Sequence, residues 1–438
     1  MKLLNSAAVS LLVVFAQASS ETRSTSQAEE TQLPRVMHTA VRERAVVTVG
    51  TDEGEIRGTD QRALQAAVDY VASLGGGTVE IGAGEFTMRD SLHLRSHVTV
   101  RGQGAKTILR KAQGALSPLQ IDGDYGEEQV TLKDSSGFEV GDGITVRDKN
   151  SGGFHTTVAR IIGRTENTFV ISLPLNADCM VDNGAEAATV FPVVSGYHLD
   201  GARVEDLTIE GNREQNTSLN GCRGGGIFLY RCPGAVLLRC VVRNYHGDGI
   251  SFQQSNDVTV QHCVCESNAG LGLHPGSGSQ RPIVSHCIAR GNGEDGLFLC
   301  WRVKQGLFEE NLLEGNGRYG ISIGHKDTDN LLRMNQIRGN HEDGVYFRNE
   351  SEGMAGHRNR LENNVIENNG VNHEAAGIRV RGETRDLVFK ENIIRDTRPI
   401  GEKKQSIGIQ LEKSVGAVSL QDNQVDAATE LVDEREKP

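Results

Sequence analysis

The hydrophobic pattern repeats along the chain at a nearly constant step. A glycine followed by an aliphatic residue returns every 23 or 24 residues through the middle of the chain, and at longer steps near its end. Within each period apolar and polar residues alternate, as in Ile250–Gln253, which predicts short strands with one buried face. A fixed period of this length indicates a solenoid, in which each coil buries its apolar side against the next. The register glycines are Gly226, Gly249, Gly272, Gly296, Gly320, Gly344, Gly377 and Gly408.

Two further columns keep the same register. One lies nine residues before the glycines and contains Cys240, Cys263, Cys287, Asn311 and Asn335, continued by Asn364 and Asn392. An Asn at each inner corner can hydrogen-bond the backbone of its neighbours, so this column predicts a ladder, and Cys can fill the same small buried niche. Two residues on, Val242, Cys265, Ala289, Leu313, Ile337, Ile366 and Ile394 form an apolar inward column. Cys240, Cys263, Cys265 and Cys287 are therefore predicted to be buried free thiols.

A helix is predicted just before the repeat. Thr59 or Asp60 can cap it, and Leu64, Ala67, Val68, Val71 and Leu74 follow helical spacing. Gly75–Gly77 ends it. A helix in this place covers the open first coil, which a solenoid needs for solubility.

The remaining segments suggest how the chain is organised. Residues 1–18 are typical of an export signal, with Lys2, an apolar core and a small-x-small site at Ala16–Ala18, and residues 19–45 form a polar lead-in predicted to be disordered. The expected β-helix domain covers 46–425, with a β-rich excursion at 124–196 and an acidic tail at 426–438. No later segment reaches the ~20 apolar residues of a membrane span. A secreted or periplasmic protein is predicted.

Several segments resemble a known group. Gly76–Ile81, Val98–Gly104 and Val204–Asn212, followed by the coils, are similar to the pectin-lyase-like β-helix superfamily. The resemblance implies a single-stranded right-handed parallel β-helix. It leaves the activity open, because members include lyases, hydrolases, epimerases and proteins with no known activity. The lyases commonly use a Lys or Arg base, often with Ca²⁺, so Ca²⁺ is an implied cofactor, although their calcium-site carboxylates have no clear match here.

The outward positions of the coils suggest a binding surface. The protein carries a net charge of −12, which argues against wholesale nucleic-acid binding and makes a local cationic stripe informative. Such a stripe with aromatic side chains suits an acidic polysaccharide or oligosaccharide, because rings stack on sugars and Arg pairs with carboxylate. Solvated strands also carry these residue types, so an ordinary surface is the alternative. The predicted substrate-binding residues are His274, Trp301, Arg302, Tyr346, Arg379 and Arg381.

Three functions fit this surface. A polysaccharide lyase or epimerase needs a base beside a uronate carboxylate and a cation to neutralise it, for which Lys326 or His325 and Arg348 are the predicted catalytic residues. A glycoside hydrolase needs two carboxylates, for which Asp327, Asp329 and Glu350 are candidates. A glycan-binding or structural protein needs only the groove. The Asp before Gly in His246–Gly249, Glu294–Gly296 and Glu342–Gly344 is interpreted as a turn residue.

Overall fold

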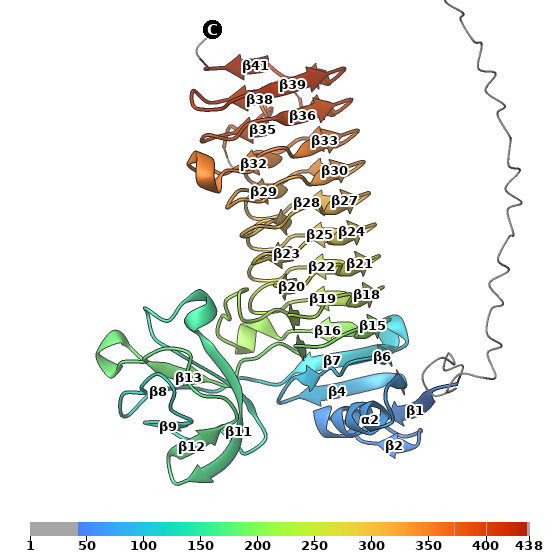
Figure 1. Cartoon of the computed structure of the whole chain (residues 1–438), viewed down its shortest axis with the longest axis vertical. Helices are drawn as coiled ribbons and strands as arrows, with labels where there is room; N and C mark the ends of the chain where they lie inside the picture. Colours follow the sequence, from blue (N-terminus) through green and yellow to red (C-terminus); the bar gives the residue numbers. More distant parts are fainter. Residues whose placement is uncertain (1–42, 372, 400, 436–438) are drawn as a thin grey trace, which may run out of the picture. The chain divides into compact units, whose positions relative to one another are not determined.

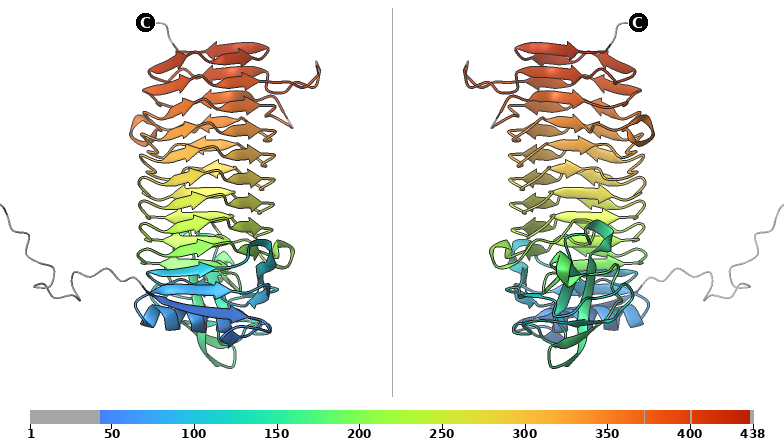
Figure 2. Two further views of the ribbon diagram at one scale, coloured as in Figure 1. Left: turned by 90° about the vertical axis from the view of Figure 1, so that its right-hand side faces the viewer. Right: turned by 90° about the vertical axis from the view of Figure 1, so that its left-hand side faces the viewer.

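The computed structural model describes residues 43–371, 373–399 and 401–435, so the predicted signal segment and most of the lead-in lie outside the described residues. From Ala45 onward the chain winds into stacked coils, as the repeat predicted, and each coil contributes a strand to three parallel sheets (Figures 1 and 2). In the described residues no helix is long and apolar enough to cross a membrane.

The three sheets, here called I, II and III, form the sides of the coil stack. Sheet I contains β1 Ala45–Gly50, β2 Ile56–Arg57, β3 Gly77–Ile81, β6 Val98–Arg101, β15 Arg203–Glu205, β18 Val236–Leu238, β21 Thr259–Gln261, β24 Ile283–Ser285, β27 Leu307–Glu309, β30 Leu331–Arg333, β33 Arg360–Glu362, β36 Leu387–Lys390 and β39 Val418–Gln421. Sheet II contains β4 Gly84–Met88, β7 Thr107–Lys111, β16 Thr208–Glu210, β19 Val241–Arg243, β22 Val264–Glu266, β25 Ile288–Arg290, β28 Leu312–Glu314, β31 Gln336–Arg338, β34 Val365–Glu367, β37 Ile393–Arg395 and β40 Gln424–Asp426. Sheet III contains β5 Leu92–His93, β14 Val194–Tyr197, β17 Ile227–Tyr230, β20 Ile250–Gln253, β23 Leu273–Gly276, β26 Leu297–Phe298, β29 Ile321–Ile323, β32 Val345–Phe347, β35 Ala376–Val380, β38 Ile407–Leu411 and β41 Thr429–Asp433.

The register glycines stand where the coils leave no room for a side chain. A Cβ added at Gly272 would lie 2.7 Å from the carbonyl oxygen of Gly296 and 2.8 Å from the Nδ2 atom of Asn292. Gly296 and Gly320 meet the next coil and Asn316 or Asn340 in the same way. The glycine repeat therefore marks the place where each coil approaches its neighbour and a buried amide most closely.

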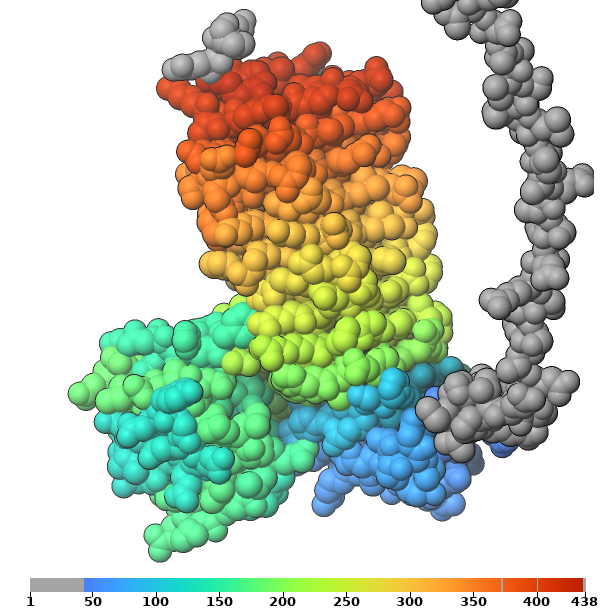
Figure 3. Space-filling view, in the orientation of Figure 1, coloured from blue at the N-terminus to red at the C-terminus, as the bar shows by residue number. Residues whose placement is uncertain are grey.

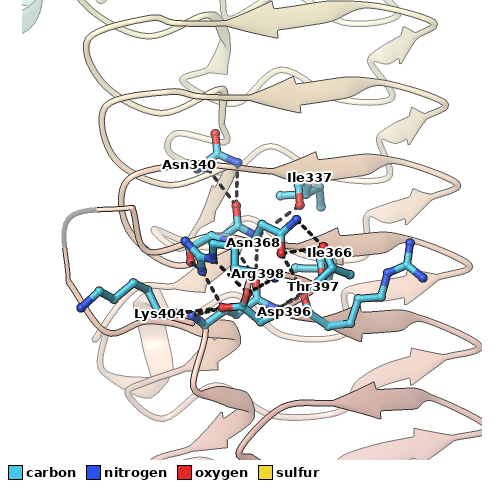
Figure 4. A network of polar contacts seen from close by, with 11 residues as sticks. Ile337, Asn340, Ile366, Asn368, Asp396, Thr397, Arg398 and Lys404 are labelled. Atoms are coloured by element: carbon cyan, nitrogen blue, oxygen red, sulfur yellow. Dashed lines mark hydrogen bonds and ion pairs between the residues drawn. The ribbon is translucent and has the colours of Figure 1, made fainter. Parts of the chain in front are cut away.

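Buried amides tie the coils together in two ladders. In the predicted ladder, the backbone N–H of Asn311 donates to Oδ1 of Asn335 at 3.0 Å, and the bond recurs through Asn364 and Asn392, which confirms that prediction. The second ladder was not predicted; it contains Asn268, Asn292, Asn316, Asn340 and Asn369 and ends on Gln405. Figure 4 shows its end, where Asp396, Arg398 and Lys404 hold the neighbouring turn. All eight cysteines are free thiols, and the predicted four are fully buried.

The N-terminal end of the stack is covered as predicted. Helix α2 spans Gln61–Ser73, and the side chain of its N-cap Asp60 accepts a hydrogen bond from the backbone N–H of Arg62 at 2.9 Å. Leu64, Val68 and Val71 are buried against the first strands. The apolar face of the helix thus closes the core.

A fourth sheet leaves the coil stack between β7 and β14. It contains β8 Leu116–Pro118, β9 Gln129–Thr131, β10 Gly143–Arg147, β11 Thr157–Thr165, β12 Thr168–Ile171 and β13 Glu186–Ala188, and is called the insert here. Its strands pair antiparallel around their own core, which includes Phe138 and Phe169. The insert projects beside the lower coils on the side of sheet III (Figures 1 and 3). Its strands begin at Leu116, earlier than the expected segment 124–196.

Short 3-10 helices occur in connecting segments, at η2 Gly104–Lys106, η3 Gly153–His155, η4 Val181–Asn183, η5 Arg213–Gln215 and η6 Glu352–Met354. At the C-terminal end the stack runs further than the expected boundary at 425. Strand β41 pairs parallel with β38, so residues assigned to an acidic tail form part of the last coil. Leu431 of β41 pairs with the buried Ile409 of β38, so the strand keeps the register of the coils although Leu431 itself is exposed.

Candidate functional site

The outer face of sheet III carries the predicted surface column. Strand pairing aligns Phe228, Ser251 and His274, and further up Phe298, Ser322, Tyr346, Arg379 and Gln410, which confirms the predicted register. Ser251 and His274 are nevertheless buried, because the insert and the chain around residues 216–226 cover this face in the lower coils. The column is therefore half covered and half open.

A cavity of about 550 Å³ lies where the covered part begins. Its walls come from insert residues 147–152, from residues 218–222, and from coil residues that include Asp248, His274, Glu294 and Arg318. Asp248, Glu294 and Arg318 belong to turns that lead into strands of sheet III, and His274 lies in strand β23 of that sheet. The cavity thus brings together segments about 170 residues apart in the sequence.

A buried histidine–carboxylate pair lies in the wall of this cavity. The Oδ2 atom of Asp248 is 2.7 Å from Nδ1 of His274, and both side chains are almost fully buried. The other oxygen of Asp248 accepts a hydrogen bond from the backbone N–H of Leu271 at 3.0 Å. Asp248 therefore holds the Nδ1–H tautomer of His274, which leaves Nε2 as the basic nitrogen. That nitrogen lies 3.4 Å from the side-chain nitrogen of Gln253.

The position directly before the register glycine is an Asp in three coils, and the partner of its second carboxylate oxygen differs among them. One oxygen of Asp295 accepts from the N–H of Tyr319 and one oxygen of Asp343 accepts from the N–H of Ala376, as Asp248 does with Leu271. This confirms the turn interpretation for one oxygen of each residue. The second oxygen binds His274 in the lowest coil, binds Arg379 in the highest, and has no partner in Asp295.

Burial shifts the protonation of several groups in and beside the cavity. Burial raises the pKa of Asp295 to about 7. The pKa of Glu294, at the cavity rim, is also raised, first by burial and then by the nearby charge of Asp248. Burial lowers the pKa of His246 to about 3, and neither ring nitrogen of this cavity-lining residue has a hydrogen-bond partner. Near neutral pH Asp295 is thus expected to be partly protonated and His246 to be neutral.

Cations face the cavity from both sides. Lys149 of the insert is exposed and has no ion pair within the described part of the chain. Arg318 of the coils is half exposed, and the nearest carboxylate oxygen, in Glu342, is 4.0 Å away. Arg147, by contrast, is held by Glu186. Lys149 and Arg318 are therefore the groups best placed to meet an anionic ligand.

The predicted catalytic residues lie further up the face. Arg348 donates to Oδ2 of Asp327 at 3.0 Å, to Ser322 and to the carbonyl of Leu299, and its guanidinium lies over Phe298. Asp327 is fully buried, and burial raises its pKa to about 7 although Arg348 opposes that shift. Arg348 thus supports the turn at Asp327 from the next coil up.

His325 and Lys326 occupy a turn beside Trp301. The Nε2 atom of His325 is 2.8 Å from Oε1 of Glu350, and its ring stacks on Trp301 with centroids 5.1 Å apart. Lys326 and Arg302 are exposed. The structure therefore brings the predicted residues His325, Lys326, Glu350, Trp301 and Arg302 together.

The remaining predicted residues are largely neutralised. Arg379 is paired with Asp343, and Arg381 with Glu412 and the hydroxyl of Tyr346. Asp329 is paired with Arg358 on another turn, away from its predicted carboxylate partners Asp327 and Glu350. Most of the predicted cationic stripe is therefore a set of ion pairs.

A second histidine constellation joins the insert to the first coils. Nδ1 of His93 lies 3.1 Å from Oγ of Ser195, and Nε2 lies 2.9 Å from Asp90, which also binds Arg160 of the insert. In hydrolase triads the assignment is reversed, because the Ser contacts Nε2 of the His and the Asp contacts Nδ1. Because Ser195 is also buried, this network is a structural junction.

The described residues do not supply a metal site. No three His, Cys, Asp or Glu side chains among them converge closely enough to hold a metal ion. The residues present thus do not fit the implied Ca²⁺, and no chemical step is derived through it.

The functional residues missed in the sequence occupy turns before the register glycines. Asp248, Glu294 and Arg318 stand one or two positions before Gly249, Gly296 and Gly320. Aligning the preceding turns would have placed these three residues next to His274.

Comparisons with known proteins agree with this architecture. A family model described as periplasmic copper-binding protein (NosD) matches residues 206–393. The A-module of mannuronan C-5 epimerase AlgE6 from Azotobacter vinelandii superposes with a TM-score of 0.56 at 15% identity, covering 89% of this chain and 96% of that one. The polygalacturonase from Erwinia carotovora ssp. carotovora superposes with a TM-score of 0.55 at 12% identity, covering 91% and 98%. A search of curated protein sequences found no match. The chain therefore has the pectin-lyase-like fold, a right-handed parallel β-helix.

Proposed function

We propose that this chain is a secreted or periplasmic carbohydrate-active protein that acts on an acidic polysaccharide, by proton abstraction next to a uronate carboxylate. The observation that carries the proposal is the buried Asp248–His274 pair in the wall of a cavity that Lys149 and Arg318 also line. The similar folds of a mannuronan epimerase and a polygalacturonase support a glycan substrate. The reacting centre is thus placed lower on sheet III than Lys326 and His325.

The chemistry assigns one role to each group. Nε2 of His274 accepts the C5 proton of a uronate, and Asp248 stabilises the imidazolium that forms. The electron pair of the broken C–H bond passes into the carboxylate, where Arg318 or Lys149 neutralises the enolate-like charge. Glu294, whose pKa is raised, is the proton donor.

Two products are available from that anion. Return of a proton to the opposite face of C5 inverts the sugar, which is epimerisation. Alternatively, the electron pair forms a C4–C5 double bond while the C4–O bond breaks, and Glu294 protonates the leaving oxygen. The first leaves the chain length unchanged, and the second shortens it.

The experiment uses a panel of polyuronates, including alginate and polygalacturonate, in D₂O, with and without Ca²⁺. Deuterium incorporation at C5 shows epimerisation, and ultraviolet absorbance of the double bond shows elimination. Binding without either signal or new reducing ends would contradict the proposal and leave a glycan-binding protein.

One observation favours a glycoside hydrolase as second candidate. Asp248 and Asp295 hold the same turn position two coils apart, so strand spacing puts them roughly 9–10 Å apart, near the range of roughly 6.5–9.5 Å in inverting hydrolases. Burial raises the pKa of Asp295 to about 7, so a protonated fraction is present near neutral pH, as a general acid requires. New reducing ends without absorbance, abolished in Asp295→Asn, would establish this function instead.

A further inference from the structure

Two adjacent turns beside sheet III share an unusual backbone. Trp301 and Arg302 have φ angles of 62° and 67°, and His325 and Lys326, one coil further, have 47° and 66°. Other coil turns of the described chain use single left-handed residues. The equivalent turn one coil below holds Ser277 and Gly278, so two left-handed residues in succession belong to this position.

The side chains at these turns work against that backbone. The left-handed region brings Cβ close to the following carbonyl, and glycine alone adopts it freely. Gly278 shows that glycine is compatible with this turn. Large side chains also occupy single left-handed positions elsewhere on the coils, as at Arg281 and Arg358, so these two turns stand out by holding two such residues in succession.

The contacts form a shaped surface. Trp301 is 43% exposed and stacks on His325 at an interplanar angle of 26°. His325 is in turn held by Glu350, and its Nδ1 atom is buried without a partner. The indole is thus fixed in place while remaining accessible.

The charges on this surface are uncompensated. Neither Arg302 nor Lys326 forms an ion pair within residues 43–435 that the structure describes, whereas Arg348, Arg379 and Arg381 higher on the face are all paired. Both side chains are exposed. The guanidinium of Arg302 lies over the Trp301 ring, 5.9 Å from its centroid, and an aromatic ring with cations that lack carboxylate partners suits a sugar ring that carries an anionic group.

We infer that Trp301, Arg302, His325, Lys326 and Glu350, here called the turn platform, form an anchoring subsite for an acidic sugar residue outside the cavity. The indole stacks on the sugar ring, and the two cations bind its carboxylate or sulfate. Cys300, which precedes Trp301, lines the cavity, so a glycan chain can occupy both places. The inference rests on the proposed function only for the choice of an acidic glycan.

Trp301 is the only tryptophan in the sequence, so intrinsic fluorescence reports on the platform directly. The test uses full-length His274→Gln protein, which keeps the platform but not the proposed base. Binding of oligouronate and of sulfated hexasaccharides is titrated by Trp301 emission and by calorimetry, with a neutral hexasaccharide as control. We expect the emission to change with the acidic glycans and not with the neutral one.

The decisive variant is Arg302→Gly with Lys326→Gly. Because glycine suits these φ angles, we expect the Tm to stay the same or rise, while affinity for the acidic glycan falls roughly tenfold. The matched control is Arg281→Gly with Arg358→Gly, which removes two positive charges from left-handed positions (φ 52° and 56°) elsewhere on the coils. Affinity there should change less than about twofold.

Three results would overturn the inference: equal loss in both double variants, no loss in the platform variant, or equal binding of the neutral glycan. The proposed function fails separately. If glycans bind with a Trp301 signal but no member of the panel is turned over, the platform stands and the catalytic proposal falls. If turnover occurs and the platform variant binds like its parent, the platform falls alone.

Discussion

Sheets II and III have the same strand architecture but opposite outer faces. On sheet II the outward residues alternate in charge along the stack: Arg110, Glu210, Arg243, Glu266, Arg290, Glu314, Arg338, Glu367, Arg395 and Asp426. Ion pairs form between neighbouring strands along this column, as between Glu266 and Arg290 at 2.6 Å. On sheet III the corresponding column holds Ser251, His274, Phe298, Ser322 and Tyr346, without alternation.

The difference indicates what each face does. An alternating column satisfies every charge within the protein and keeps strand edges solvated. The face of sheet III instead leaves a carboxyl oxygen of Asp295 without a hydrogen-bond partner, Lys326 without an ion pair among the described residues, and Arg318 only 4.0 Å from its nearest carboxylate oxygen. Groups left unsatisfied on one face of a protein that satisfies them elsewhere are the best candidates for ligand contact.

The largest expected effect separates the two faces by activity. His274→Gln or Asp248→Asn should reduce turnover of the active polyuronate by about 10²–10⁴-fold, because each removes the oriented base. Glu266→Gln on sheet II should leave turnover unchanged. The measurement is the rate of deuterium incorporation or of double-bond absorbance, with Tm as a folding control. Retained activity in both cavity variants would move the reacting centre away from this pair.

The next effect concerns stability and pH. Asp295 has a folded-state pKa of about 7, above its unfolded value, so its protonated form is favoured in the folded protein. Its contribution is fully present below the unfolded pKa and is lost as pH rises toward 7. Asp295→Asn should therefore gain on the order of 2–4 kcal/mol relative to the parent on going from pH 4 to pH 8.

The matched variant is Asp257→Asn, on the sheet I side. Its hydrogen bond with Arg281 lowers the pKa of Asp257, so the parent should gain relative to this variant as pH rises, by a small amount because the pair is exposed. Urea denaturation at both pH values measures the two differences. If raising the pH changed the stability of both variants relative to the parent in the same direction, the raised pKa of Asp295 would be contradicted.

A smaller effect tests the role of Arg318. Arg318→Gln should lower kcat/KM for the acidic substrate by about 10–100-fold, since a charge-assisted contact to the carboxylate is lost. The same loss in kcat/KM should not appear for Arg338→Gln, because Arg338 lies on sheet II and is ion-paired there. Steady-state kinetics at two salt concentrations checks this, and equal losses would indicate a general electrostatic effect.

The smallest effect tests the alternating column itself. Arg290→Glu places three acidic residues in succession and should destabilise the fold by about 0.5–1 kcal/mol, because exposed pairs contribute little each. Adding Glu266→Gln and Glu314→Gln removes both contacts between like charges and should restore part of that loss. A double-mutant analysis by urea denaturation measures it. No recovery would show that the alternation has no energetic role.

Much of the fold could be predicted from the sequence, because each coil of a solenoid repeats the same requirements at the same positions. The register glycines, the ladder through Asn311 and Asn335, and the inward column through Val242 and Leu313 each recur once per coil, so a single pattern is confirmed many times. The capping helix was readable because Asp60 and its apolar spacing are local. The second amide ladder and strand β41 follow the same repeat, but residues inserted into the later coils make their spacing irregular.

The candidate site could be predicted from the sequence only in part. The sequence by itself determined the coil register and hence that His274 and Tyr346 share a face, because parallel strands in register place residues one period apart beside each other. Only the tertiary structure decided that the insert turns Lys149 toward the coils, and that Asp327 is buried while Lys326 is not. Those outcomes depend on contacts between segments with no shared period and on how much water each group loses, and neither quantity is encoded in a repeat.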